Sequence, residues 1–238
     1  TTSINSGQTS GRKNLIINGA MQVAQRGTSA STSGYQTVDR FFLNTDGVDE
    51  EPTQAQVAVS SGTTPYTAGF RQAFKITNGN QTSGAGAADN IIIQYYIEAQ
   101  DIASSGWDYT SSSSFITLSF YVKSSVAQNY FGRLMAIDGT QYNYPFETGS
   151  LSADTWTKIT KTIPGNSALQ FDNNADRGLS VEFCMFRGTD KTGSVTLNQW
   201  ATYDSAARIP DMTSTWYTTN NATWEMTGVQ LEVGSTAT

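Results

Sequence analysis

The most informative absence in this chain is histidine. Its 238 residues include no His and a single cysteine, Cys184. Without an imidazole, neither a Ser-His-Asp nor a Cys-His catalytic arrangement can form, and zinc sites built from His or several Cys are excluded as well. One cysteine also rules out an intrachain disulfide, which fits folding in a reducing cytoplasm. Because Cys184 stands in the apolar run 181–186, we interpret it as a buried thiol rather than a nucleophile.

Charge and long apolar runs are also scarce. Charged residues make up 14% of the chain, and the formal net charge is −6. This acidic balance, with no Lys/Arg cluster, argues against nucleic acid as a partner and against a polybasic membrane anchor. No apolar stretch approaches the roughly 18 residues of a membrane span, and residues 1–8 lack the basic and apolar regions of a signal peptide. We therefore expect no nucleic acid and no membrane insertion.

What the sequence does contain is period-two alternation. In Ile116–Lys123 every second side chain is apolar, which is the pattern of a half-buried strand. The run Leu179–Met185 alternates in the same way, and turn residues such as Pro164 and Gly165 end neighbouring runs. On this pattern we expect strands at 38–43, 53–60, 70–77, 91–99, 116–123, 131–137, 156–163, 179–185, 194–200 and 224–233.

Many short strands separated by Gly, Asn and Ser indicate an all-β fold, an antiparallel β-sandwich of jelly-roll type. Helix is expected at most as one turn within 201–209. Residues 1–13, rich in Ser, Thr and Gly, are expected to form a short extended N-terminal arm that docks on a partner. Residues 14–238 then form the sandwich domain. From alternation and aromatic size, we place four side chains in its core: Leu118, Phe120, Trp156 and Phe183.

Carboxylates and other oxygen ligands are present, but no spacing pairs them. A glycosidase needs two facing carboxylates, and sequence alone does not bring any two together. Residues 138–140 and 172–176 offer oxygen ligands for calcium, yet neither has a complete EF-hand pattern. We interpret both segments as polar turns, with calcium as the alternative, and predict no catalytic residue, no metal and no cofactor. The acidic candidates are Asp49, Glu50, Asp101, Asp108, Asp138 and Glu147.

Aromatic residues in polar segments are the candidate binding residues. Flat rings beside Asn, Asp, Thr and Gln are suited to a sugar surface, because the ring stacks on the sugar while the polar groups bond its hydroxyls. The alternative is that such rings anchor loops to the core or lie in a subunit interface. The candidates for glycan or receptor contact are Trp107, Tyr109, Tyr142, Tyr144, Trp216 and Tyr217.

Motifs along nearly the whole chain resemble one group of proteins. The segment 14–27, followed by Tyr35–Phe41, resembles the opening of bacteriophage tail-fibre and related virion proteins. The resemblance continues through 118–124, through 156–165, which ends in Ile-Pro-Gly, and through Gly178–Ser180. It closes with Thr227–Gly234. The first and last motifs are the more specific ones.

The resemblance implies a jelly-roll domain similar to carbohydrate-binding modules, usually in a trimeric fibre or spike. Within the motifs, Asp39 and Arg40 stand in an otherwise apolar strand, so we expect a partly buried ion pair or hydrogen-bond cluster of structural purpose. Gly228 in the last predicted strand suggests a bulge or a close backbone approach.

These observations lead to a non-enzymatic virion protein as the expected function. The leading interpretation is a tail-fibre or appendage subunit, made in the host cytoplasm, that binds a host-surface receptor or glycan. We expect it to contact other virion proteins through its N-terminal arm and to form a homotrimer. The alternatives are a capsid decoration or tail-assembly subunit with no ligand of its own, and a polysaccharide-degrading enzyme.

Overall fold

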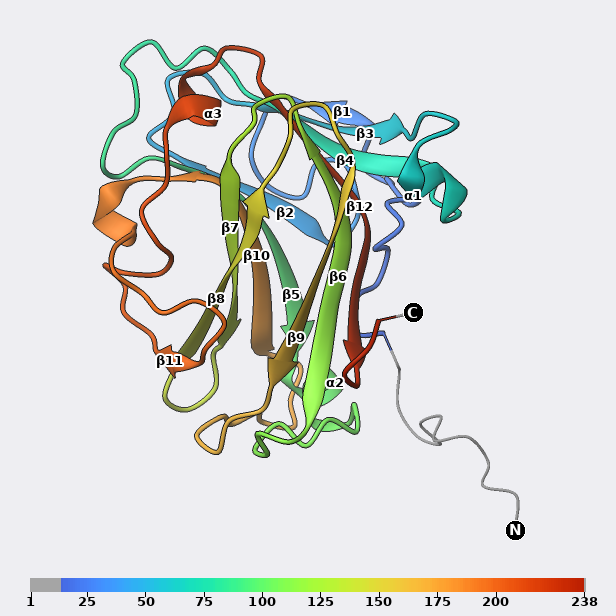
Figure 1. Ribbon diagram of the computed structural model, residues 1–238, viewed down its shortest axis with the longest axis vertical. Coiled ribbons are helices and arrows are strands. Elements are labelled where there is room, and N and C mark those ends of the chain that lie inside the picture. Colours follow the sequence, from blue (N-terminus) through green and yellow to red (C-terminus); the bar gives the residue numbers. More distant parts are fainter. Residues whose placement is uncertain (1–13, 238) are drawn as a thin grey trace.

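The computed structural model describes residues 14–237, so the predicted arm, residues 1–13, lies outside the described residues. Two six-stranded antiparallel sheets pack face to face as a β-sandwich, which confirms the predicted fold (Figure 1). The strands are β1 Ser29–Ala30, β2 Phe41–Asp46, β3 Thr53–Ala58, β4 Gln72–Thr77, β5 Asn90–Glu98, β6 Phe115–Ser124, β7 Asn129–Ala136, β8 Tyr142–Ser150, β9 Thr157–Pro164, β10 Arg177–Arg187, β11 Ala201–Thr202 and β12 Thr223–Val233.

Each sheet is named here by a central strand. The β12 sheet has the order β1-β3-β4-β12-β6-β9, and the β10 sheet has the order β11-β8-β7-β10-β5-β2. Helix is confined to single turns between strands: α1 Thr64–Thr67, α2 Ala99–Ala103, α3 Thr215–Thr218 and a 3-10 turn at Thr189–Lys191. No helix within residues 14–237 is long and apolar enough to cross a membrane.

The core lies between the two sheets and follows the predicted alternation. Leu118 and Phe120 of β6 are at most 1% exposed, and Phe183 of β10 is 2% exposed. Phe120 and Phe183 therefore meet from opposite sheets, as expected. Burying a large apolar side chain contributes roughly 1.5–3 kcal/mol, so these inward rows supply much of the stability of the sandwich.

Trp156 is not a core residue, and its placement there was wrong. It lies half-buried just before β9, where Ile159 and Ile163 are the residues that point inward. Side chains alternate along a strand, and Ile159 and Ile163 face inward, so the side chain at position 156 faces outward. The ring instead lies under the ammonium group of Lys123, 5.1 Å from its centroid, on the outer face of the β12 sheet.

Three segments differ from their predicted structure. β8 was missed because Pro145 and several polar residues interrupt its pattern; proline is tolerated because β8 is an edge strand for most of its length, with only the two-residue β11 beside it. The predicted strand 194–200 is an irregular loop instead. Asn198 there has φ +58°, and Trp200 turns inward to donate its indole N–H to the Pro164 carbonyl oxygen at 2.8 Å. The single turn expected within 201–209 is not helical, since 201–202 form β11.

The last strand joins the start of the described chain. The Leu15 amide donates to the Leu231 carbonyl oxygen at 2.8 Å, which places residues 14–15 beside β12. The pairing of β12 with β6 shifts register between Thr227 and Gln230. Gly228 sits in this bulge with φ +63°, and a Cβ there would meet the Phe70 ring at 2.6 Å. Both the bulge and the close approach predicted for Gly228 are confirmed.

Candidate functional site

The outer face of the β10 sheet is covered over only part of its area. The segment 189–213, called here the cover segment, runs along β8, β7 and β10 (Figure 1). Ile209 of this segment packs on Ile92 of β5 and Cys184 of β10 in a small apolar cluster, each residue at most 1% exposed. Burial raises the pKa of the Cys184 thiol to about 11, so the thiol is protonated at neutral pH, in agreement with its interpretation as a buried, unreactive group.

Beside this cluster lies a buried ion cluster. Glu182 on β10 accepts hydrogen bonds from Arg133 at 2.6 and 2.8 Å and from Arg187 at 3.0 Å. Burial raises the pKa of the Glu182 carboxyl, but the two guanidinium groups outweigh this effect and the pKa falls to about 2. Glu182 is therefore a buried anion at neutral pH, fixed by charge-assisted bonds.

A chain of amides and hydroxyls connects this ion cluster to the open part of the face. Gln94 on β5 donates to Glu182 at 2.9 Å, and its oxygen accepts from the Tyr96 hydroxyl at 2.9 Å and from Asn44 at 3.0 Å. The guanidinium carbon of Arg177 then lies 4.4 Å from the centroid of the Tyr96 ring. Tyr96 is thus held on one side by a rigid network, with its ring at the edge of the uncovered face.

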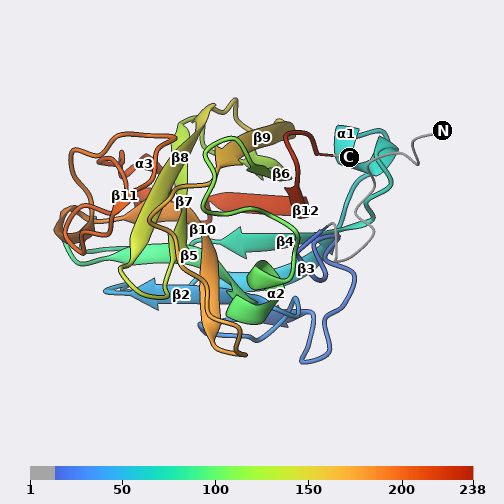
Figure 2. The same cartoon turned by 90° about the horizontal axis from the view of Figure 1, so that it is seen from below.

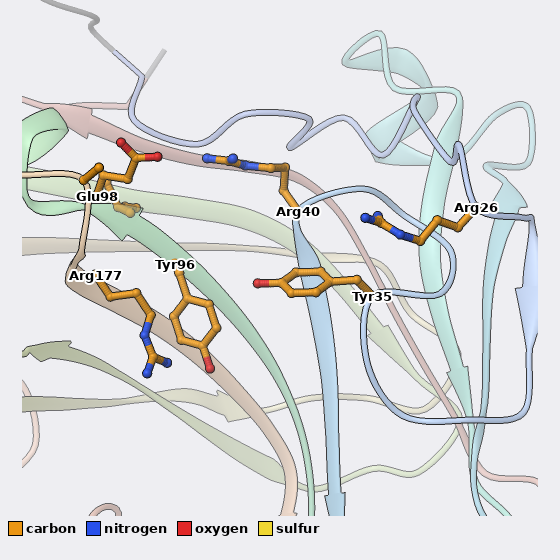
Figure 3. A pocket seen from close by; sticks show the side chains of 8 residues that line it. Arg26, Tyr35, Arg40, Tyr96, Glu98 and Arg177 are labelled. Atoms are coloured by element: carbon orange, nitrogen blue, oxygen red, sulfur yellow. The ribbon is translucent and has the colours of Figure 1, made fainter.

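At this edge the surface is hollowed by a pocket of about 390 Å³, called here the arginine pocket. In Figure 3 the Tyr35 hydroxyl points toward Tyr96, and Arg40 reaches toward Glu98. Burial raises the pKa of both tyrosines, although nearby guanidinium groups oppose it, so both phenols are neutral at neutral pH. The lining residues are Arg26, Tyr35, Arg40, Tyr96, Ile97, Glu98, Ala175 and Arg177.

Local backbone structure presents these side chains from three distant segments. Gly34 forms an isolated antiparallel bridge with Leu43 of β2, and its φ of +102° turns the chain so that Tyr35 follows. The ring of Tyr35 packs against Phe42 with centroids 5.0 Å apart. Arg40 itself has φ +76°, a left-handed conformation that costs a residue with a Cβ roughly 1–2 kcal/mol. Strained backbone of this kind is often found where a side chain must be aimed.

The arginine pocket has the chemistry of a binding site rather than of a hydrolase. Glycoside hydrolysis uses two carboxylates roughly 5–9.5 Å apart on either side of the scissile bond. Among the residues that line this pocket, Glu98 alone is acidic. What the pocket offers is two aromatic rings, the hydroxyl of Tyr35 as a donor and three guanidinium groups.

The six predicted contact residues are not brought together. They lie on the loop before β6, on β8 and on α3. Four of them, Trp107, Tyr144, Trp216 and Tyr217, are at most 3% exposed, so the premise that their rings face solvent was wrong. Three of them anchor loops to the core, which is the alternative stated above. The Trp107 indole donates to the Ser114 carbonyl oxygen at 3.3 Å, the Trp216 indole to that of Thr223 at 3.1 Å, and the Tyr217 hydroxyl to Asp89 at 2.9 Å. Tyr144 on β8 packs its ring against Trp200, with centroids 5.3 Å apart.

Tyr109 and Tyr142 remain half-buried, packed against the core at separate places. Tyr109 meets the Phe171 ring edge to face at 5.0 Å. Contact of either residue with a ligand stays a prediction.

The sequence analysis singled out Asp39 and Arg40, but it did not identify Arg40 as a residue that lines a pocket. Asp39 does form the expected hydrogen bond, since it accepts from the Gln25 amide at 3.0 Å. No ion pair between Asp39 and Arg40 is found within residues 14–237; Arg40 is exposed and lines the pocket instead. The charged pair in a predicted apolar strand was therefore the one sequence feature that pointed to the pocket. No sequence pattern singled out Tyr96, Glu98 or Arg177.

The two segments considered for calcium do lie side by side. The Asp172 amide donates to the Asp138 carboxylate at 3.0 Å, which gives that carboxylate the role of a turn acceptor. In the part of the chain that the structure describes, no group of three or more His, Cys, Asp or Glu could hold a metal ion.

Comparison with known proteins gives similarity at the level of structure. No protein-family profile matches the sequence, and no curated protein matches it. A candidate sugar-binding protein from Bacteroides thetaiotaomicron is 13% identical, with a TM-score of 0.45 over 93% of this chain and 100% of that one. A CBM4 carbohydrate-binding module is 12% identical, with a TM-score of 0.44 over 92% and 99% of the two chains.

A third solved structure is the N-terminal cellulose-binding domain of β-1,4-glucanase C from Cellulomonas fimi. It is 10% identical, with a TM-score of 0.41 over 90% of this chain and 100% of that one. At such identity the likeness concerns the arrangement of the sheets alone.

Proposed function

We propose that this chain is a non-enzymatic glycan-binding protein and that a sugar binds in the arginine pocket. The observation that carries the proposal is the pocket itself, where rings and hydrogen-bond donors converge on a space of about 390 Å³. Small-molecule sites are hollows of roughly 300–1,000 Å³ that combine aromatic walls with a few placed polar groups. The rings of Tyr35 and Tyr96 offer flat apolar faces, and their hydroxyls suit the polar groups of a sugar.

The rigidity of the pocket supports the same function. Tyr96 is fixed through Gln94 to the buried Glu182 cluster, so its ring is ordered before a ligand arrives. Side chains that are already ordered lose less conformational freedom on binding, and this raises affinity.

The test is a glycan array probed with the purified protein, with Tyr35→Ala and Tyr96→Ala as pocket variants. We expect wild type to bind a subset of saccharides and both variants to lose at least tenfold in affinity. Tyr121→Ala is the matched control, because Tyr121 is a half-buried tyrosine on the outer face of the other sheet. Wild type that binds no saccharide, or pocket variants that bind as the control does, would contradict the proposal.

For the biological setting, we propose a bacteriophage appendage subunit that attaches to a host-surface glycan. What supports it is the resemblance of 14–27, 35–41 and 227–234 to tail-fibre and related virion proteins. An antibody to this protein should label the distal tip of a fibre on intact particles. A regular array over the head would favour a decoration subunit with no ligand, and absence from the particle would refute a virion role.

A homotrimer is proposed on the same resemblance. Three of the four sheet edges do not require it, because β1 and β11 are two residues long and the edge strand β9 carries Lys158, Lys161 and Pro164. Short strands, lysines and proline all hinder pairing at an edge. Three linked copies of the binding site would strengthen adhesion, since linked sites raise avidity by roughly 10²–10⁴-fold. Light scattering should give three times the 25.7 kDa chain mass, and a monomer at micromolar concentration would refute the trimer.

The absence of catalysis is proposed because Glu98 is the single carboxylate among the residues that line the pocket. Incubation with each polysaccharide that the array identifies should release no reducing ends. If ends appear and Glu98→Gln abolishes them, the protein is a hydrolase.

A further inference from the structure

The arginines of the described chain fall into two groups. Within residues 14–237 there are seven. Four are used internally: Arg133 and Arg187 bond Glu182, Arg71 donates to the Tyr66 carbonyl oxygen at 2.8 Å, and Arg208 donates to that of Ser205 at 3.0 Å.

The other three, Arg26, Arg40 and Arg177, all line the arginine pocket. For the guanidinium groups of Arg26 and Arg40, no hydrogen bond or ion pair is found in the described residues. Arg177 stacks on the Tyr96 ring at 4.4 Å and forms a side-chain hydrogen bond that lowers the pKa of the Tyr96 hydroxyl.

The pocket is therefore positive in a protein that is negative. Three guanidinium groups and one carboxylate give its lining a formal charge of +2, whereas the whole chain carries −6. At physiological ionic strength, charges farther away than roughly 8–10 Å are largely screened. The charged side chains that line the pocket are these three arginines and Glu98, and Asp39 and Asp176 stand next in sequence to two of the arginines.

The arginines also come from segments far apart in sequence. Arg26 stands before β1, Arg40 directly precedes β2, and Arg177 begins β10. Arg40 holds a left-handed backbone conformation that is unfavourable for any residue with a Cβ. Three like charges around one hollow, one of them on a strained backbone, are explained most directly by a negative ligand.

We infer that the sugar bound in the arginine pocket carries a negative charge, as the carboxylate of an acidic sugar or a sugar phosphate. The inference rests on the proposed function and adds the class of ligand to it. Guanidinium groups present forked N–H donors that match planar carboxylates and phosphate oxygens in paired hydrogen bonds. The tyrosine rings contact the sugar ring, and the arginines select the charge.

The test is an array of matched glycan pairs, in which each uronic-acid glycan is printed beside its carboxyl-reduced form and each phosphorylated glycan beside its dephosphorylated form. We expect at least a tenfold preference for the charged member of a pair. Preference within the uronic-acid pairs identifies a carboxylate, and preference within the phosphorylated pairs identifies a phosphate. The preference should weaken as NaCl rises from 50 to 300 mM.

Two variants connect the preference to the pocket. Arg40→Gln and Arg177→Gln keep polar side chains but remove the charge, and each should reduce the charged-over-neutral preference about tenfold. Lys158→Gln, on an exposed residue of the other sheet, is the control with the same loss of charge. Arg177→Lys keeps the charge without the fork and should restore part of the preference.

The outcomes separate the two proposals. Wild type that binds the neutral member as well as the charged one, with Gln variants like wild type, overturns the charge inference and leaves glycan binding intact. Binding of no glycan in either form overturns the proposed function, and the charge inference with it.

Discussion

The ring of Phe120 on β6 meets the ring of Phe183 on β10 edge to face, with centroids 4.9 Å apart across the interior of the sandwich. Phe146 and Trp224 surround the pair at 6.3–6.5 Å from Phe183 or Phe120. This aromatic group joins the two sheets at their centre, because β6 and β10 each have paired neighbours on both sides.

Removal of either ring should be costly. Phe120→Ala and Phe183→Ala are each expected to lower the free energy of unfolding by about 3–5 kcal/mol, since each leaves a cavity. The rings contact each other, so the double variant should lose less than the sum of the two. Denaturant melts measure all three. Trp156→Ala, on the outer face, is the control and should cost about 1 kcal/mol; a loss below that for either Phe variant would contradict this packing.

The buried Glu182 predicts a large mutational effect of a different kind. Glu182→Gln leaves Arg133 and Arg187 buried without an anion, and breaking a buried ion pair by removing one partner costs about 3–5 kcal/mol. Denaturant melts at pH 7 should show this loss. A cost near zero would mean that water reaches the two guanidinium groups.

The same residue makes stability depend on pH. The folded pKa of Glu182 is about 2, below its ordinary value of 4.5, because Arg133 and Arg187 outweigh the effect of burial. A depressed carboxyl pKa contributes stability that is present above pH 4.5 and lost as the pH falls toward 2. Over this window wild type should lose more unfolding free energy than Glu182→Gln. Equal slopes for the two proteins would contradict the assignment.

Cys184 should report on the cover segment. Its thiol is buried with a pKa of about 11, so the folded protein should react with a thiol reagent at pH 8 only through opening. Ile209→Ala removes an apolar contact under the cover segment and should speed labelling more than it lowers global stability. Ile159→Ala in the other sheet is the control, because its labelling rate should follow global stability alone.

Arg40 should show a conflict between stability and binding. Glycine adopts its φ of +76° without the steric penalty of a Cβ. Arg40→Gly should therefore be more stable than Arg40→Ala by about 1 kcal/mol, while both lose the contribution of the arginine to ligand binding. Thermal melts and the glycan array together measure this. Equal stability of the two variants would mean that the loop relaxes out of the left-handed conformation.

The sandwich was predictable because alternation is a local property. β6 and β10 carry inward-facing apolar residues at every second position, and the same counting from Ile159 and Ile163 places Trp156 outside. β8 was not predictable, since Pro145 is acceptable only because β8 has almost no neighbouring strand on one side. A local sequence pattern does not show which strands lie at the edge of a sheet.

The arginine pocket was beyond sequence reasoning for a related reason. Arg40 and Arg177 line the same pocket because β5 lies between β2 and β10, a pairing that no spacing reveals. Aromatic residues in polar segments gave a misleading signal, because Trp216 and Tyr217 find their polar partners in the backbone and in Asp89. An aromatic ring beside polar residues does not by itself distinguish a loop anchor from a ligand contact.

The position of β12 has a consequence for how the chain reaches this structure during synthesis. It lies between β4 and β6, so a chain that ends before residue 223 has its first sheet in two pieces, β1-β3-β4 and β6-β9 (Figure 2). Until the residues of β12 emerge from the ribosome, β4 with Phe74 and β6 with Phe120 are not joined in one sheet. Native folding must then wait for nearly the whole chain, and prematurely terminated products should expose strand edges and aggregate.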